Sequence, residues 1–253
     1  MIKLRTFISI LFIISIQFLT AEEKPVHIFI LSGQSNMAHM DPETGFLPEA
    51  QKLFKDEKVV YIKVAQGGKP IALWVKEWPQ IAEKHKIQSK RIKLAYKSVP
   101  ENEMRTVYYK PIIEQYWELI KKYPNPSSVT FCWMQGERDG SGKYGPAYEE
   151  ALTQLISNLR RDLKRDNMNF VIARIGDANP GQRQGWLPVR EAQLKVVNAD
   201  PRGAWVDCDD LNDGKSPNAV HYAKEDYVRL GQRFARQGHA LAKGEEPAAD
   251  GRP

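Results

Sequence analysis

The stretch Val26-His-Ile-Phe-Ile-Leu-Ser-Gly-Gln-Ser-Asn-Met37 begins as an apolar run of strand length and stops abruptly at Gly33. Ser35 follows two residues later. A serine on a tight turn after a buried strand is pushed out at the sheet edge, where backbone N–H groups can hold an anion, so Ser35 is a candidate nucleophile. An ordinary polar turn is the alternative. The α/β-hydrolase elbow G-x-S-x-G is absent, because Met37 occupies the place of its second glycine.

The rest of the chain alternates strand and helix patterns. Further strands are predicted over 58–65, 128–134, 169–175 and 204–208, and helices from residue 49 and over 71–83, 107–122, 148–163, 187–197 and 224–242. This alternation predicts one α/β domain with a three-layer α/β/α architecture and a five-stranded, mainly parallel sheet.

The N-terminal segment predicts export. Lys3 and Arg5 precede an apolar run that ends before Ala21 and is too short to span a bilayer. We therefore expect a cleaved signal peptide over 1–21 and a secreted or periplasmic protein, with an uncleaved anchor as the alternative. The domain is expected over 22–242, followed by a flexible polar tail over 243–253.

Composition narrows the function classes. The formal charge of +6 is mild, and the basic cluster over 84–97 is typical of a solvated face, so no nucleic-acid partner is expected. Cys132 and Cys208 both fall in predicted strands and are interpreted as buried thiols. Zinc-binding spacings and a phosphate-binding loop are absent from the sequence, which predicts neither a metal nor a cofactor.

Polar or glycine-rich segments follow the predicted strands where each strand ends. They are Ser35, Gly67-Gly68, Gln135 with Glu137, and residues 209–221. Because the carboxyl ends of parallel strands meet at one sheet edge, we expect these segments to lie together. A hydroxyl, an imidazole and neutral N–H donors suit acyl transfer, with glycine amides and the Gln135 amide as oxyanion donors.

The preferred general base is His221. His27 enters the first strand, His85 lies in the basic stretch, and His239 comes late on the last helix. His39 is near Ser35 in sequence but would have to fold back, so it is the second candidate.

Several motifs together resemble a known family. They are Gly33-Gln-Ser-Asn-Met37, Ala65-x-Gly-Gly68 with Trp74, Trp133-x-Gln-Gly-Glu137 with Asp139, Arg190-Glu-Ala-Gln193 with Trp186, Asp207-x-Asp-Asp-Leu211, and His221-Tyr222. They are similar to the SGNH/GDSL-like hydrolases, and more narrowly to the sialate O-acetylesterase/acetylxylan esterase branch, carbohydrate esterase family 6. The resemblance covers nearly all of residues 25–240.

The resemblance implies a flavodoxin-like sheet and metal-free deacetylation of sugars through an acyl-serine. It assigns Ser35 as the nucleophile and His221 as the general base. It assigns the oxyanion hole to the Ser35 amide, a Gly67 or Gly68 amide and the Gln135 side chain. Glu137 then supports the site without attacking.

One position departs from the family pattern. The family usually has Asp three residues before the histidine, where it orients the imidazole, and this chain has Asn218. In a serine protease the same Asp-to-Asn change lowers kcat about 10⁴-fold. Either another carboxylate takes the third role (Asp213, Asp210 or Glu137), or the site works as a Ser–His dyad, or the protein binds sugar with little hydrolysis.

The leading hypothesis is an exported carbohydrate O-acetylesterase whose partner is an acetylated sugar or polysaccharide. A general short-chain esterase and a carbohydrate-binding pseudo-enzyme are the alternatives. The sequence predicts neither the sugar nor the oligomeric state.

Overall fold

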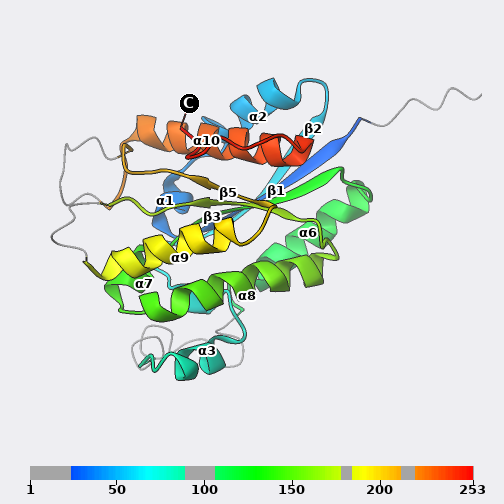
Figure 1. Ribbon diagram of the computed structural model, residues 1–253. Coiled ribbons are helices and arrows are strands. Elements are labelled where there is room, and N and C mark those ends of the chain that lie inside the picture. Colours follow the sequence, from blue (N-terminus) through cyan, green and yellow to red (C-terminus); the bar gives the residue numbers. More distant parts are fainter. Residues whose placement is uncertain (1–23, 89–105, 178–183, 212–219, 253) are drawn as a thin grey trace, which may run out of the picture.

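The computed structural model describes residues 24–88, 106–177, 184–211 and 220–252, and its centre is one five-stranded sheet (Figure 1). The strand order is β2-β1-β3-β4-β5, and every neighbouring pair is parallel. This is the flavodoxin-like order. The strands are β1 (Val26–Gly33), β2 (Lys58–Ala65), β3 (Ser128–Met134), β4 (Asn169–Ala173) and β5 (Gly203–Val206).

The opening stretch forms the central strand β1, which lies between β2 and β3. Its four consecutive apolar residues 28–31 are completely buried. A strand covered on both faces needs apolar side chains on both, which explains why this stretch is a continuous apolar run and does not alternate.

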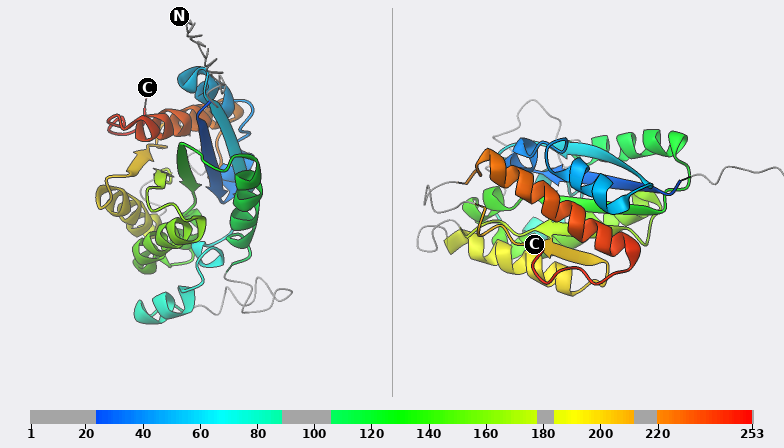
Figure 2. Two further views of the ribbon diagram at one scale, coloured as in Figure 1. Left: turned by 90° about the vertical axis from the view of Figure 1, so that its right-hand side faces the viewer. Right: turned by 90° about the horizontal axis from the view of Figure 1, so that it is seen from above.

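Helices cover both faces of the sheet and complete the three predicted layers (Figure 2). One face carries α2 (Phe46–Phe54) and α10 (Lys224–Lys243), and the other carries α6 (Lys110–Lys122), α8 (Gly145–Leu163) and α9 (Leu187–Asn198). Each of these helices follows a predicted helical pattern. The α/β fold class is confirmed.

One predicted helix is divided in two. The segment expected as a helix over 71–83 forms a short 3-10 turn, η1 (Ile71–Leu73), and a separate helix, α3 (Trp78–Lys84). Pro79 lies in the first turn of α3. Proline has no N–H and fits only the first turn of a helix, so a continuous helix across this position is disfavoured.

Two short helices stand where polar turns were expected. The helix α1 (Ser35–His39) follows β1 directly, and α7 (Glu137–Ser141) follows β3. A third short element, η2 (Gln184–Trp186), precedes α9. The helices α1 and α7 lie at the same end of the sheet, at the carboxyl ends of the strands (Figure 1).

The segment after α10 lies against β5, although a flexible tail was expected there. The amide of Asp207 donates to the carbonyl of Asp250 over 2.7 Å. The Nε2 of Gln237 donates to the carbonyl of Ala248 over 2.8 Å. The expected signal peptide lies outside the described residues. No helix within the described part of the chain is long and apolar enough to cross a membrane.

Both cysteines are free and buried, as predicted. Cys132 lies on β3 and Cys208 follows β5. Complete burial raises the pKa of both thiols, which keeps them protonated and unreactive.

Candidate active site

The carboxyl ends of the neighbouring strands β2, β1 and β3 are joined by backbone hydrogen bonds. Gly33 has a φ of +147°, and a Cβ at this position would lie 2.0 Å from the carbonyl oxygen of Met134. Only glycine fits so close an approach of β1 to β3. The amide of Gln34 donates to Met134 over 2.9 Å, and the amide of Gln66 donates to Gly33 over 3.1 Å. The loops after β1, β2 and β3 therefore start side by side.

Ser35 is the first residue of α1 and is 8% exposed. Amides in the first turn of a helix have no acceptor within the helix, so the Ser35 N–H is suited to receive an anion. Gly67 flanks this position, since a Cβ at Gly67 would lie 3.6 Å from the Cβ of Ser35. Gly68 has a φ of +68° and open space beside it. Ser35, the predicted nucleophile, and Gly67 thus lie side by side, and Gly68 is the next residue along the chain.

Buried polar side chains connect the loops further. The Oε1 of Gln34 accepts hydrogen bonds from the amide of Arg138 (3.2 Å) and from the Nε2 of Gln135 (3.3 Å). The same Nε2 of Gln135 donates to the carbonyl of Lys69 over 3.0 Å and to the carboxylate of Asp139. These bonds fix the loops after β1, β2 and β3 relative to one another.

Gln135 therefore lies beside the site with its amide already engaged. It is fully buried, and its Oε1 accepts from the Tyr148 hydroxyl over 2.9 Å. Its role as an oxyanion donor stays a prediction, and would require an amide hydrogen to leave Asp139 or Lys69. Burial raises the pKa of Asp139 to about 7, although hydrogen bonds from Gln135 and from the Ile71 amide oppose the shift.

Asn36 joins α1 to the segment that carries His221. Its side chain is fully buried, and its Nδ2 donates to Glu137 Oε1 over 2.7 Å and to the carbonyl of Val220 over 3.0 Å. The residue after the predicted nucleophile is thus bonded to the residue before the predicted base. Glu137 contacts this junction rather than solvent, as it is only 3% exposed.

His221 is exposed, and its ring packs edge-on against His39 with centroids 4.9 Å apart. His39 is four residues after Ser35 on α1 and therefore on the same helical face. The structure contains no hydrogen bond between the Ser35 hydroxyl and the described His221 ring; such bonds are often long in unliganded enzymes. Partial burial, and then the neighbouring His39, lower the pKa of His221.

The third catalytic position has no occupant in the described part of the chain. Asp210 accepts hydrogen bonds from Nη1 and Nη2 of Arg233, at 2.7 and 2.6 Å, which lowers the pKa of Asp210. Within the described ranges no carboxylate forms a hydrogen bond to the His221 ring. Asp213 and Asn218 lie outside the described residues.

Ion pairs hold the segment after β5. The guanidinium of Arg190 on α9 donates to both carboxylate oxygens of Asp209 at 2.7 and 2.9 Å, and Arg174 reaches the same carboxylate at 2.7 Å. Gln193, one turn along α9, donates to the carbonyl of Gln135 over 2.8 Å. The motif on α9 thus supports the loops after β3 and β5.

Sequence reasoning missed the structural roles of several site residues. Gln34, Asn36 and Gln193 belong to motifs quoted for the resemblance, but only their side-chain contacts reveal what they do. Tyr227 on α10 packs against the core, and its hydroxyl donates to Asn36 Oδ1 over 3.0 Å, a contact that a helical pattern does not reveal. The one sequence signal that could have identified Asn36 is its position as a polar residue directly after the candidate nucleophile.

A comparison with known protein families shows which family this chain belongs to. A family model described as "Carbohydrate esterase, sialic acid-specific acetylesterase" matches residues 38–240. The chain belongs to this family. As a member of the carbohydrate esterases it has the α/β fold and the parallel sheet described above, and the predicted relationship is confirmed.

Solved structures share the fold of this carbohydrate esterase. A protein from Arabidopsis thaliana superposes with a TM-score of 0.58 at 21% identity, over 85% of this chain and 98% of its own. A carbohydrate acetylesterase from Xanthomonas citri superposes with a TM-score of 0.58 at 14% identity, over 89% of this chain and 58% of its own. A search of curated proteins gave no match.

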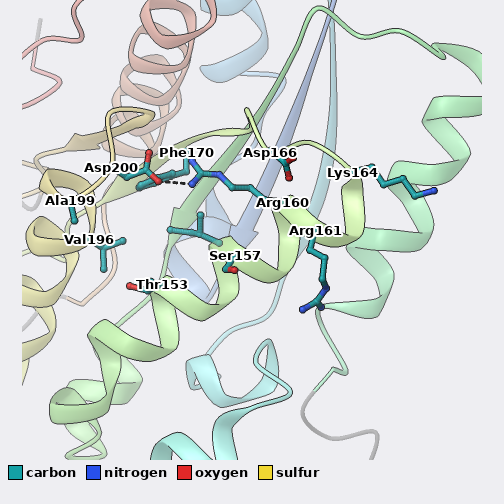
Figure 3. A pocket seen from close by; sticks show the side chains of 11 residues that line it. Thr153, Ser157, Arg160, Arg161, Lys164, Asp166, Phe170, Val196, Ala199 and Asp200 are labelled. Atoms are coloured by element: carbon teal, nitrogen blue, oxygen red, sulfur yellow. Dashed lines mark hydrogen bonds and ion pairs between the residues drawn. The ribbon is translucent and has the colours of Figure 1, made fainter.

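A separate cavity of about 650 Å³ lies between α8 and α9 of this carbohydrate esterase (Figure 3). Arg160 crosses it to bond Asp200 at 2.5 Å, and it also donates to the carbonyl of Met168. Phe170, at the amino end of β4, lies beneath that guanidinium. The cavity contains none of the predicted site residues. Among the described residues no cluster of three or more metal-binding side chains occurs.

Proposed function

We propose that this member of the carbohydrate esterases is an exported serine esterase that removes O-acetyl groups from carbohydrate through an acetyl-Ser35 intermediate. Family membership supports the reaction class. The observation that supports the mechanism is the bond from Asn36 to Val220, because it joins the neighbours of Ser35 and His221 across the sheet edge.

In the proposed mechanism the Ser35 hydroxyl attacks the acetyl carbonyl and gives its proton to His221. The amides of Ser35 and Gly67 stabilise the oxyanion that forms. Collapse of this intermediate expels the sugar alkoxide, which takes the proton from His221 and leaves an acetyl ester on Ser35. Water then attacks the ester while His221 accepts its proton and returns it to the Ser35 oxygen, which releases acetate. A lowered pKa keeps His221 neutral, and therefore basic, at neutral pH.

The test compares Ser35→Ala and His221→Gln with the control Ser127→Ala, which changes an exposed serine before β3 at the opposite edge of the sheet. We expect Ser35→Ala to reduce acetate release by at least about 10³-fold and the control to leave it unchanged. Mass spectrometry of protein quenched during turnover should find an acetyl group on Ser35. Undiminished hydrolysis by Ser35→Ala would refute the mechanism.

A substrate panel separates a carbohydrate esterase from a general short-chain esterase. Acetylated xylan and O-acetylated sialic acid are compared with p-nitrophenyl butyrate at equal enzyme concentration. Higher kcat/KM on an acetylated sugar supports the proposal, and a preference for the butyrate ester supports the alternative.

A second candidate function is carbohydrate binding without turnover. It is favoured by Asn218 in the sequence and by the lack of a carboxylate bonded to His221 among the described residues. Saccharide affinity by calorimetry, with no acetate release and no gain from Asn218→Asp, would support it. A gain in kcat from Asn218→Asp would instead identify a working esterase limited by the orientation of its base.

Export is part of the proposal and rests on residues 1–21. Expression of the full chain in a secreting host should yield mature protein whose N-terminal sequence begins at Glu22. Retention of the intact leader on membranes would support the anchor instead.

A further inference from the structure

The buried amide of Asn36 uses all of its main hydrogen-bonding positions. Its two Nδ2 hydrogens go to Glu137 Oε1 (2.7 Å) and to the carbonyl of Val220 (3.0 Å), and its Oδ1 accepts from the Tyr227 hydroxyl (3.0 Å). A flipped amide would set its oxygen against a carboxylate and a carbonyl oxygen, so only one orientation is favourable. Aspartate cannot replace this residue, because a carboxylate has no hydrogen to donate.

The hydroxyl of Tyr227, in the first turn of α10, completes the arrangement. Because it gives its one hydrogen to Asn36, it accepts from the backbone amide of Tyr222 over 3.2 Å. The same oxygen lies 3.1 Å from Nδ1 of His39, which therefore carries the hydrogen of that bond.

These bonds surround residue 221. Asn36 holds the carbonyl of the residue before it, and Tyr227 holds the amide of the residue after it. Asn36 and Tyr227 are themselves bonded, and Asn36 is adjacent in sequence to Ser35. The backbone that carries His221 is thus fixed from both sides by groups anchored at the nucleophile.

We propose that Asn36 and Tyr227 are positioning residues that hold His221 at the side of Ser35. The inference rests on the proposed function for its effect on catalysis, but the restraint on residues 220–222 is independent of turnover. A positioning restraint of this kind suits a chain with Asn218 where the family has Asp, because orientation then comes from the backbone. Misplacement of a catalytic group by about 1 Å can cost about 10²-fold in rate.

The principal test is Tyr227→Phe, which removes one oxygen and keeps the ring. The matched control is Tyr109→Phe, which removes another part-buried tyrosine hydroxyl, one that donates to Asp162 over 2.8 Å near the start of α6. Hydrogen exchange of the Tyr222 amide should accelerate about tenfold in Tyr227→Phe and stay unchanged in the control. Unchanged exchange in Tyr227→Phe would overturn the proposal whether or not the protein is an esterase.

Kinetics provides the second readout. Tyr227→Phe should lower kcat on an acetyl ester about 10- to 100-fold with little change in KM, and the acid limb of kcat/KM should move upward as His221 becomes more solvated. A merely structural role would lower the melting temperature without moving that limb. Asn36→Asp should lower kcat further. The proposal would also be overturned if this variant had the kcat of the unmodified protein and the same hydrogen exchange at the Tyr222 amide.

The two proposals fail differently. Activity that survives Ser35→Ala rejects the proposed function, while the exchange experiment still reports on the restraint. Faster exchange in Tyr227→Phe with wild-type kcat on a confirmed serine esterase rejects positioning.

Discussion

The change Gly67→Ala in the loop after β2 should affect catalysis without lowering the stability of the fold. Gly67 does not have a left-handed backbone, and an alanine Cβ would lie 3.6 Å from the Cβ of Ser35 and 3.9 Å from its Cα. These are ordinary van der Waals distances, so the folded protein can accommodate the methyl group. Replacing glycine at a compatible position stabilises by about 0.4–1 kcal/mol through the unfolded state.

The same methyl group occupies space that the reaction needs. The acetyl carbon must bond to the Ser35 hydroxyl oxygen, one bond from the Cβ that the methyl would touch. Its oxyanion must also come within about 2.7–3.1 Å of the amide donors. Loss of one such donor costs about 10²–10³ in kcat, so we expect Gly67→Ala to lose about 10²-fold.

The assay measures kcat/KM for an acetyl ester beside the melting temperature, with Gly68→Ala as the comparison. Gly68 has a φ of +68° and no atom within 4 Å of a Cβ, so alanine there costs about 1–2 kcal/mol of backbone strain with no steric contact. We expect stable but nearly inactive Gly67→Ala, and less stable but more active Gly68→Ala. Wild-type kcat/KM in Gly67→Ala would refute the geometry of the site.

Three further predictions concern the site and its supports. His221 acts as a base only when unprotonated, and its pKa is lowered, so activity should fall only when the pH drops below the ordinary pKa range of histidine. The variant His39→Gln removes one cause of the lowered pKa and should move the acid limb of the pH–rate profile to higher pH. Gly33→Ala should lower the free energy of unfolding by about 3 kcal/mol or more and give insoluble protein, because its Cβ would lie 2.0 Å from the carbonyl oxygen of Met134. A soluble variant with an unchanged melting temperature would contradict this prediction. The pKa of Asp139 is raised to about 7, so the folded state binds more protons than the unfolded state between roughly pH 4 and 7. Stability from this group should therefore fall as pH rises through that window, and Asp139→Asn should flatten the dependence in chemical denaturation at several pH values.

The sequence was sufficient to predict the sheet because β1, β3 and β4 are apolar runs and β2 shows strand-like alternation. β2 and β3 have the predicted bounds, and β4 and β5 differ by one or two residues at their ends. The short helices α1 and α7 were missed because five residues are too few to show a helical period. Both consist mainly of polar or small residues, for which a turn is the more frequent outcome.

The proximity of the site segments followed from topology, but their contacts did not. Parallel strands bring their carboxyl ends together, which predicted that Ser35 and Gly67 lie near one another. The bonds from Asn36 to Val220 and to Tyr227 join residues almost two hundred positions apart, and no local pattern encodes them. For Gln135 the sequence shows that its amide suits an anion, and the structure adds that this amide also donates to Asp139 and to the carbonyl of Lys69.

The strand β5 lies at the margin of the sheet, where unpaired backbone groups can recruit a strand from another molecule. Two contacts cover this strand: the amide of Asp207 donates to the carbonyl of Asp250 after α10, and the carbonyl of Trp205 accepts from Gln237 on α10. A purification tag fused at the C-terminus, or removal of residues 245–253, would disturb these contacts and expose the edge of β5. We expect self-association into aggregates, because the unpaired backbone groups of β5 would then be accessible to another molecule.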